Sequence, residues 1–321
     1  MKLRTEVNIV ATTAQRIKVE HQVFSIGSCF ASEMSQRLSD GQLRTLHNPF
    51  GTIFNPYSIH QAMQRITANH HYTASDLIFE NGRYLSLDHH TSFDHQDETL
   101  VLENINQNIQ SAHHFLKEAQ WVIITYGTSF IYEYLPTRQP VANCHKIPQQ
   151  RFSKRLLSDA EIQNAMAETI ACIQNIAPED VQILFSISPV RHTKEGMIEN
   201  QWSKAKLINQ LHQVIAELPH AHYLPIYEIM VDDLRDYRFY KADMIHPTPQ
   251  AVDYIFEQFM AAYAAPETRD FIKENFKILN GLQHRPLLQD EAYTRFLDQL
   301  KQKMAQQQAK VSFPIFKEER K

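Results

Sequence analysis

Short apolar segments that alternate with longer amphipathic segments are the feature that most constrains the fold of this chain. The most apolar short segment, residues 121–126, reads Trp-Val-Ile-Ile-Thr-Tyr, and residues 23–26 and 181–187 have the same character. Apolar runs of this length are typical of strands that are buried on both faces of a sheet. Between them, residues 158–176 and 201–218 carry apolar side chains at helical spacing. The alternation predicts an α/β fold in which helices cover both faces of a mostly parallel sheet, a three-layer α/β/α sandwich.

Two further segments interrupt this alternation. Asn81-Gly82 separates two alternating runs within residues 77–87, which is the pattern of a β-hairpin with a two-residue turn. Residues 132–141 also resemble a hairpin. We expect these segments to be antiparallel insertions. The remaining expected elements are helices at 31–38, 57–66, 97–119 and 249–263 and a strand at 223–227.

The chain changes character after Pro266. The later residues are charged and Gln-rich, as in the segment 301–308, and their spacing is helical. This change predicts one main domain at residues 1–265 and a helical C-terminal extension at 266–321. The extension is a candidate interface between copies of the chain.

Composition argues against several classes of function. A net charge of -4 gives no reason to expect nucleic acid or an anionic membrane as a partner. The cysteines Cys29, Cys144 and Cys172 are too few for a disulfide scaffold, which fits a reducing compartment. The first residues lack the apolar run of a secretory signal, and no apolar run is long enough to span a bilayer. We therefore expect a cytoplasmic protein.

No metal and no organic cofactor are expected. The chain has only 7 Gly and contains no Gly-rich loop that would cradle a phosphate. Adjacent histidines at 70–71, 89–90 and 113–114 point in different directions on a strand or a helix, so such pairs seldom chelate one ion. We interpret these histidines as surface residues.

Polar residues follow the first expected strand at the point where it ends. Gly27 allows a sharp turn, and Ser28 and Cys29 then lie at the start of a helix. Free N–H groups and the helix dipole favour an anion there, so a nucleophile would have a lowered pKa and an oxyanion site beside it. The alternative interpretation is a buried cysteine beside a serine that caps the helix.

A second candidate motif lies late in the chain. In Asp243-Met244-Ile245-His246, the carboxylate is placed to accept the Nδ1–H of the imidazole, which leaves Nε2 free to act as a base. The alternative is a solvated acid followed by a histidine at a helix entry. Other polar clusters follow apolar or hairpin-like segments at residues 127–129, 143–146 and 188–192.

Taken together and in this order, these blocks resemble the GSCFA family. Residues 27–31 read Gly-Ser-Cys-Phe-Ala, the motif after which the family is named. The resemblance covers residues 24–259 and includes the blocks at 47–52, 126–129, 143–146, 188–192, 199–204 and 234–247. The family is regarded as related to the SGNH, or GDSL-like, hydrolases. That relation implies an SGNH-hydrolase-like fold and hydrolysis of esters.

Two blocks depart from the pattern of that superfamily. Its Gly-Asp-Ser motif aligns with residues 27–29, which puts Ser28 in place of the aspartate and Cys29 in place of the nucleophilic serine. Its oxyanion-hole asparagine is replaced by Ser129. The register favours Cys29 as the nucleophile, and residue type favours Ser28, so both stay open.

The resemblance implies hydrolysis or transfer of an acyl or acetyl group on a small-molecule or saccharide ester. Cys29 or Ser28 would attack the carbonyl, with His246 as the base and Asp243 orienting it. The alternatives are a non-catalytic protein that binds a saccharide or peptide, and a metal-dependent hydrolase that uses His145, His192 and His246 together. The expected oxyanion and substrate-binding residues are Gly27, Gly51, Gly127, Ser129, Asn143, His145, Lys146 and Arg191.

Overall fold

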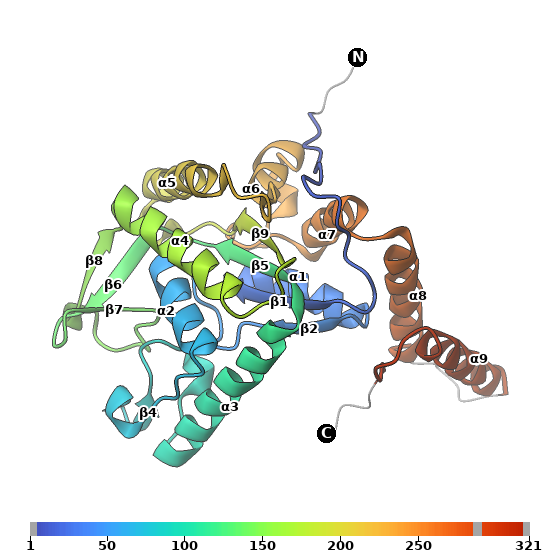
Figure 1. Ribbon diagram of the computed structural model, residues 1–321, viewed down its shortest axis with the longest axis horizontal. Coiled ribbons are helices and arrows are strands. Elements are labelled where there is room, and N and C mark those ends of the chain that lie inside the picture. Colours follow the sequence, from blue (N-terminus) through green and yellow to red (C-terminus); the bar gives the residue numbers. More distant parts are fainter. Residues whose placement is uncertain (1–4, 285–290, 317–321) are drawn as a thin grey trace.

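A five-stranded parallel sheet forms the centre of the molecule, as the alternating pattern predicts (Figure 1). The computed structural model describes residues 5–284 and 291–316. Neighbouring strands follow the order β10-β9-β5-β1-β2, and every neighbouring pair is parallel. These strands are β1 (Gln22–Gly27), β2 (Arg44–His47), β5 (Ala119–Tyr126), β9 (Gln182–Ile187) and β10 (Ala221–Tyr223).

The strand order places a topological switch point beside β1. Counted along the chain, the five strands are arranged 2-1-3-4-5, the order of one common doubly wound fold. β2 lies on one side of β1, and every later strand lies on the other. In such sheets ligands bind outside the carboxyl ends of the strands at this point, which here lies between β1 and β5. The topology therefore indicates that the residues after Gly27 and Tyr126 lie at the expected ligand-binding edge of the sheet.

Side chains of the sheet alternate between two hydrophobic clusters because successive residues of a strand face opposite sides. On β1, Phe24 and Ile26 join one cluster and Val23 joins the other. The predicted three-layer sandwich is therefore confirmed (Figure 1). The first cluster is covered by α2 (Pro56–Thr67), α3 (Glu98–Lys117), α4 (Asp159–Gln174) and α5 (Met197–Ile215), and the second by α1 (Cys29–Asp40), α7 (Pro249–Tyr263) and α8 (Pro266–Leu282).

Antiparallel strands form two units outside the main sheet. β3 (Ile78–Glu80) and β4 (Arg83–Leu85) make the predicted hairpin, and Asn81 and Gly82 both have positive φ in its turn. β6 (Phe130–Tyr134) and β7 (Gln139–Val141) make the second predicted hairpin. A further strand, β8 (Phe152–Leu156), pairs with the other edge of β6 and completes a three-stranded sheet.

Three expectations differ from the structure. The strand expected at 223–227 ends at Tyr223, because Pro225 has no N–H for a ladder and instead precedes α6 (Ile226–Glu228). α6 continues as a π-helical segment, Ile229–Asp233. The helix expected from residue 201 begins at Met197. His89, expected at the surface, is fully buried and stacks on Phe50 with ring centroids 4.2 Å apart.

The C-terminal region is helical, as expected. α8 adds Phe271 and Ile272 to the second hydrophobic cluster, and α9 (Glu291–Gln308) packs against α8. The division at residue 265 stays a prediction, and residues 1–4, 285–290 and 317–321 lie outside the described residues. Within the described residues, no helix combines the length and apolar character needed to cross a bilayer.

Candidate active site

Gly27 forms the corner at which β1 passes into α1. Its φ is 143°, and a Cβ at this position would lie 2.3 Å from the carbonyl oxygen of Thr125, so only glycine fits. The Gly27 N–H donates to Asn48 Oδ1 at 2.8 Å, and the Ser28 N–H donates to the Thr125 carbonyl at 3.0 Å. These bonds fix the start of α1 between the carboxyl ends of β1 and β5.

The two candidate nucleophiles at this corner differ in exposure. Ser28 is the N-cap residue of α1, but its buried hydroxyl makes no capping bond and has no hydrogen-bond partner among the described residues. Cys29 is the first residue of α1 and is partly exposed. Of the two candidate residues, Cys29 is therefore the more exposed one at the switch point.

The surroundings of the Cys29 thiol act on its pKa in opposite directions. Burial raises the pKa and is the largest effect. The backbone N–H groups of Cys29 and Phe30 point at the sulfur and lower the pKa. The negative charge of Glu33 raises it, and the positive charge of Lys204 lowers it by a smaller amount. Since burial dominates, a reactive thiolate at neutral pH requires a base that removes the proton.

Lys204 of α5 is fully buried beneath this corner and joins the ends of two strands. Its Nζ donates to the carbonyl of Gly127, which follows β5, at 2.6 Å, and to the carbonyl of Ser188, which follows β9, at 2.7 Å. Burial lowers the pKa of Lys204 to about 7. The sequence gives only a weak signal for this residue, namely a lysine on the apolar face of α5 that also carries Leu207 and Leu211.

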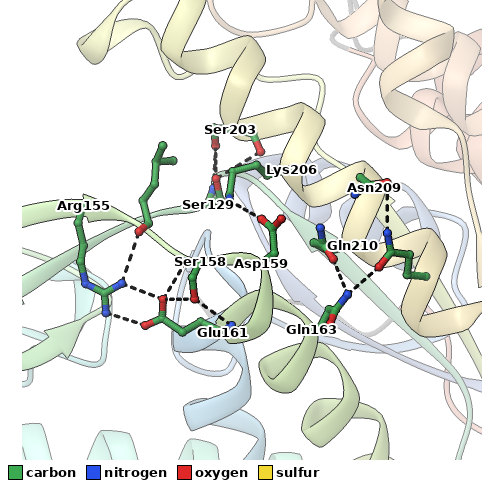
Figure 2. Close-up of polar contacts among 12 residues, drawn as sticks. Ser129, Arg155, Ser158, Asp159, Glu161, Gln163, Ser203, Lys206, Asn209 and Gln210 are labelled. Atoms are coloured by element: carbon green, nitrogen blue, oxygen red, sulfur yellow. Dashed lines mark hydrogen bonds and ion pairs between the residues drawn. The ribbon is translucent and has the colours of Figure 1, made fainter.

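Contacts on either side of Lys204 hold α5 in place (Figure 2). The Ser129 N–H donates to Ser203 Oγ at 2.7 Å, and Lys206 pairs with Asp159 at the start of α4. Ser158 and Glu161 form the capping box of α4. The neighbours of Lys204 on α5 thus contact the segment after β5 and the start of α4, which positions this part of α5.

Asp243 and His246 form the hydrogen-bonded pair that their spacing predicts. The imidazole Nδ1 lies 2.8 Å from Asp243 Oδ2, and both side chains are about two-fifths exposed. Oδ1 accepts the N–H groups of Ile245 at 2.8 Å and His246 at 3.0 Å. The His246 N–H, followed by its imidazole, holds the pKa of Asp243 well below its usual range. The carboxylate therefore stays ionised and orients the ring.

The loop that carries this pair is attached to the same edge of the sheet. The Arg191 N–H donates to the Ile245 carbonyl at 3.2 Å, and its Nη1 donates to the Met244 carbonyl at 3.3 Å. Lys241 Nζ lies 3.8 Å from Glu33 Oε1 in the first turns of α1. The loop thus lies beside the start of α1. No hydrogen bond joins the Cys29 thiol to the His246 imidazole within the described structure.

Four predicted oxyanion donors already donate to other protein groups. The Gly27 N–H is bonded to Asn48 Oδ1, the Gly51 N–H to the Asn48 carbonyl, the Gly127 N–H to the Phe54 carbonyl and the Ser129 N–H to Ser203 Oγ. These N–H groups are therefore not available to an oxyanion. The N–H groups of Cys29 and Phe30, in contrast, point at the Cys29 sulfur.

The predicted substrate-binding residues fall into two groups. Asn143 and Arg191 line a cavity of about 680 Å³ that borders Ile245, the neighbour of His246. His145 is buried elsewhere, with Nδ1 2.9 Å from Asp94 Oδ1, and Lys146 is exposed outside the cavity lining. Two further residues, Lys154 and Lys194, also line the cavity, although the sequence pattern does not predict them as site residues.

His145, His192 and His246 do not form a common metal site in the described part of the chain, where no three side chains of His, Cys, Asp or Glu gather as a ligand set. His192 instead packs against the end of β5, since a Cβ on Gly127 would lie 3.0 Å from its Nε2. Burial, then the positive charges of Lys204, Lys154 and His246, lowers the pKa of His192 to about 3. His192 is therefore neutral beside the His246 loop.

Comparison with known proteins identifies the family. No curated protein sequence matches this chain. A family 3 carbohydrate esterase from Clostridium thermocellum is 10% identical to this chain, with a TM-score of 0.36. The structural match covers 79% of this chain and 98% of the esterase chain. A DUF4886 family protein from Bacteroides uniformis is 10% identical over 88% of this chain and 93% of its own, with a TM-score of 0.38.

A carbohydrate esterase family 3 protein from Talaromyces cellulolyticus is 7% identical over 79% of this chain and 99% of its own, with a TM-score of 0.36. Similarities this low carry no conclusion about chemistry. The model of the GSCFA family, in contrast, matches residues 22–259, which include both the Gly27 corner and the His246 loop. The chain belongs to the GSCFA family.

Proposed function

We propose that the protein hydrolyses or transfers an acyl group of an ester, with Cys29 as nucleophile and His246 as base. One observation carries this proposal. The partly exposed Cys29 lies at the switch point of the sheet, and a formed Asp243–His246 pair lies in a loop attached to the same edge. A nucleophile, a base and a group that orients the base are the parts that acyl transfer requires.

In the proposed reaction, His246 Nε2 accepts the proton of the Cys29 thiol while the sulfur attacks the ester carbonyl carbon. The resulting tetrahedral intermediate collapses, the carbon–oxygen bond to the alcohol breaks, and His246 returns the proton to the leaving oxygen. A thioester remains on Cys29. Water, or an acceptor alcohol, then attacks the thioester carbon while His246 accepts its proton. The carbon–sulfur bond breaks, the acid or the new ester leaves, and the proton passes from His246 to the sulfur and restores the thiol.

The N–H groups of Cys29 and Phe30 are the proposed oxyanion donors. They stand at the N-terminus of α1, where the helix dipole also favours negative charge. The buried Lys204 ammonium contributes positive potential below the same position. These groups support both the thiolate and the charge that develops on the carbonyl oxygen.

The proposal requires the Cys29 thiol and the His246 imidazole to approach each other when a substrate binds. Catalytic hydrogen bonds are often long in substrate-free enzymes and shorten in the reactive complex. The exposed position of the His246 side chain leaves room for such a movement. The lack of a hydrogen bond between the Cys29 thiol and the His246 imidazole in the described structure is also the observation that favours a non-catalytic binding protein on the same scaffold.

Replacing His246 by Ala is expected to lower kcat/KM for p-nitrophenyl acetate by roughly 10²- to 10⁴-fold, because general base catalysis is lost. His70→Ala is the matched control, since His70 is exposed and lies on another part of the surface. Stopped-flow or plate-reader release of p-nitrophenol measures the effect. Equal rates in the two variants, or no turnover of any short-chain ester by the unaltered protein, would favour the binding-protein alternative.

A further inference from the structure

The cavity beside the His246 loop has one wall made by the small antiparallel sheet. Tyr132 of β6 is the register partner of Val141 on β7 and of Lys154 on β8. Side chains that are partners across an antiparallel ladder share one face of the sheet. All three of these residues line the cavity, together with Phe130, two positions from Tyr132 on the same face.

The alternation along β8 separates its two basic residues. Lys154 faces the cavity, whereas Arg155 faces α4 and forms ion pairs with Glu133 and Glu161 (Figure 2). Lys154 Nζ lies 4.6 Å from the centroid of the Phe130 ring and 4.9 Å from that of Tyr132. The Lys154 ammonium is therefore held at the cavity wall by aromatic rings.

The segment that follows β9 brings two more cations to the cavity. Lys194 Nζ lies 5.8 Å from the same Tyr132 ring, so it is a neighbour of Lys154. Arg191 packs on Tyr240, with its Cζ 3.7 Å from the ring centroid, and lies next to the loop of His246. Both residues follow β9, at the edge of the sheet where ligands of this fold class bind.

The charges that line the cavity do not balance. Among the described residues that line the cavity, three are basic, Arg191, Lys154 and Lys194, and one is acidic, Glu195, which pairs with Lys154. Among the described residues, no carboxylate lies within ion-pair distance of Lys194 or Arg191. Like charges gathered in a concave, partly desolvated site attract a counter-charge from solution.

We propose that this cavity binds an anionic group of the substrate, a carboxylate or a phosphate, through Lys154, Lys194 and Arg191. The inference rests on the proposed function, because the bound anion would be part of the ester that Cys29 attacks. It specifies the substrate as a negatively charged ester rather than a neutral one. Arg191 and Ile245 connect the cavity to the His246 loop, so the ester bond would lie at that end.

Calorimetric titration of the Cys29→Ala protein tests anion binding without turnover. Glutarate is the carboxylate probe, glutaramide is its neutral counterpart of the same shape, and inorganic phosphate is the second anion. We expect one of the anions to bind and glutaramide to bind at least about tenfold more weakly, because a charge-assisted bond is lost. Preference for glutarate or for phosphate identifies the source of the negative charge.

Charge variants extend the test with effects of opposite sign. Lys194→Gln is expected to weaken anion binding about tenfold, and Lys194→Arg to retain it. Glu195→Gln is expected to strengthen binding, because it removes the one carboxylate of the lining. Lys301→Gln is the control, since Lys301 is an exposed lysine of α9.

The outcomes separate this inference from the proposed function. Glutaramide that binds as tightly as the preferred anion, no binding of either glutarate or phosphate, or an unchanged affinity for the preferred anion in Lys194→Gln overturns the anion site. If the anions bind as expected and the unaltered protein cleaves neither p-nitrophenyl acetate nor the p-nitrophenyl monoester of glutarate, the anion site stands and the proposed esterase activity fails.

Discussion

Cys29→Ala protein is expected to lose at least roughly 10³-fold in kcat/KM for p-nitrophenyl esters, because removal of a nucleophile abolishes the covalent route. Ser28→Ala protein is expected to stay within about threefold of the unaltered protein in the same assay. The Ser28 hydroxyl is buried and has no hydrogen-bond partner in the part of the chain that the structure describes, so its removal breaks no bond seen there. The contrast between adjacent residues distinguishes a thiol mechanism from a hydroxyl mechanism.

Both variants need a check of folding before their rates are compared. Cys29 and Ser28 lie beside the tightly packed Gly27 corner, so thermal unfolding should show similar midpoints for the two variants. A Ser28→Ala protein that folds normally and is inactive, together with an active Cys29→Ala protein, would reverse the assignment of the nucleophile. Loss of activity in both folded variants would leave the thiol account unsupported.

Lys204→Met is expected to destabilise the protein by about 2–4 kcal/mol at pH 9, because it leaves two buried carbonyl groups without donors. The carbonyls of Gly127 and Ser188 accept the Lys204 amine at 2.6 and 2.7 Å. Methionine has a similar volume, so the cavity term is small. Urea unfolding followed by circular dichroism measures the difference in unfolding free energy.

The effect of Lys204→Met should depend on pH with a defined sign. Burial lowers the pKa of Lys204 to about 7 in the folded protein, whereas a lysine in the unfolded chain has the ordinary pKa of 10.5. Between these values the unfolded chain binds more protons, so raising the pH through this window stabilises the folded state of the unaltered protein. The variant lacks this gain.

The difference in stability between the unaltered protein and the Lys204→Met variant is therefore expected to grow from pH 6 to pH 9. Lys206→Met is a matched control on the same helix, because Lys206 pairs with Asp159 near the surface. A difference that is constant across this pH range would contradict a depressed pKa at Lys204. A variant as stable as the unaltered protein at pH 9 would contradict the role of the two carbonyl contacts.

The central layers of the fold follow from sequence because their physical signal is local. The segment 121–126 is apolar at almost every position, and the structure places it in the middle of the sheet as β5. The Asn81-Gly82 turn is equally local, since both residues tolerate the positive φ that a tight hairpin requires. Such elements need no long-range information.

Two strands were not predicted because their stability comes from pairing. β2 reads Arg-Thr-Leu-His and lies at an edge of the main sheet, where one side of a strand needs no partner. β8 reads Phe-Ser-Lys-Arg-Leu, a mostly polar sequence that forms a strand through its ladder with β6. The missed strand β8 also explains why Lys154 was not predicted as a cavity residue.

In the candidate site, too, local spacing predicts some features, whereas contacts between distant parts of the sequence determine the others. The Asp243–His246 hydrogen bond spans three residues, so spacing alone predicts it, and the structure contains it at 2.8 Å. The oxyanion donors depend on which N–H groups the surrounding loops leave unbonded, and Asn48 and Phe54 bind those of Gly51 and Gly127. His145 is predicted from the sequence to contact substrate, but in the structure it is buried against Asp94, which lies far away in the sequence.

Trapping of an acyl-enzyme shows directly whether Cys29 is the residue that carries the acyl group. The protein is mixed with p-nitrophenyl acetate, quenched in acid, digested and analysed by mass spectrometry. The account predicts one added acetyl group on the peptide that contains Cys29, located on the thiol and absent from the His246→Ala protein. An acetyl group on Ser28 instead, or no acylated peptide during observable turnover, would contradict the account.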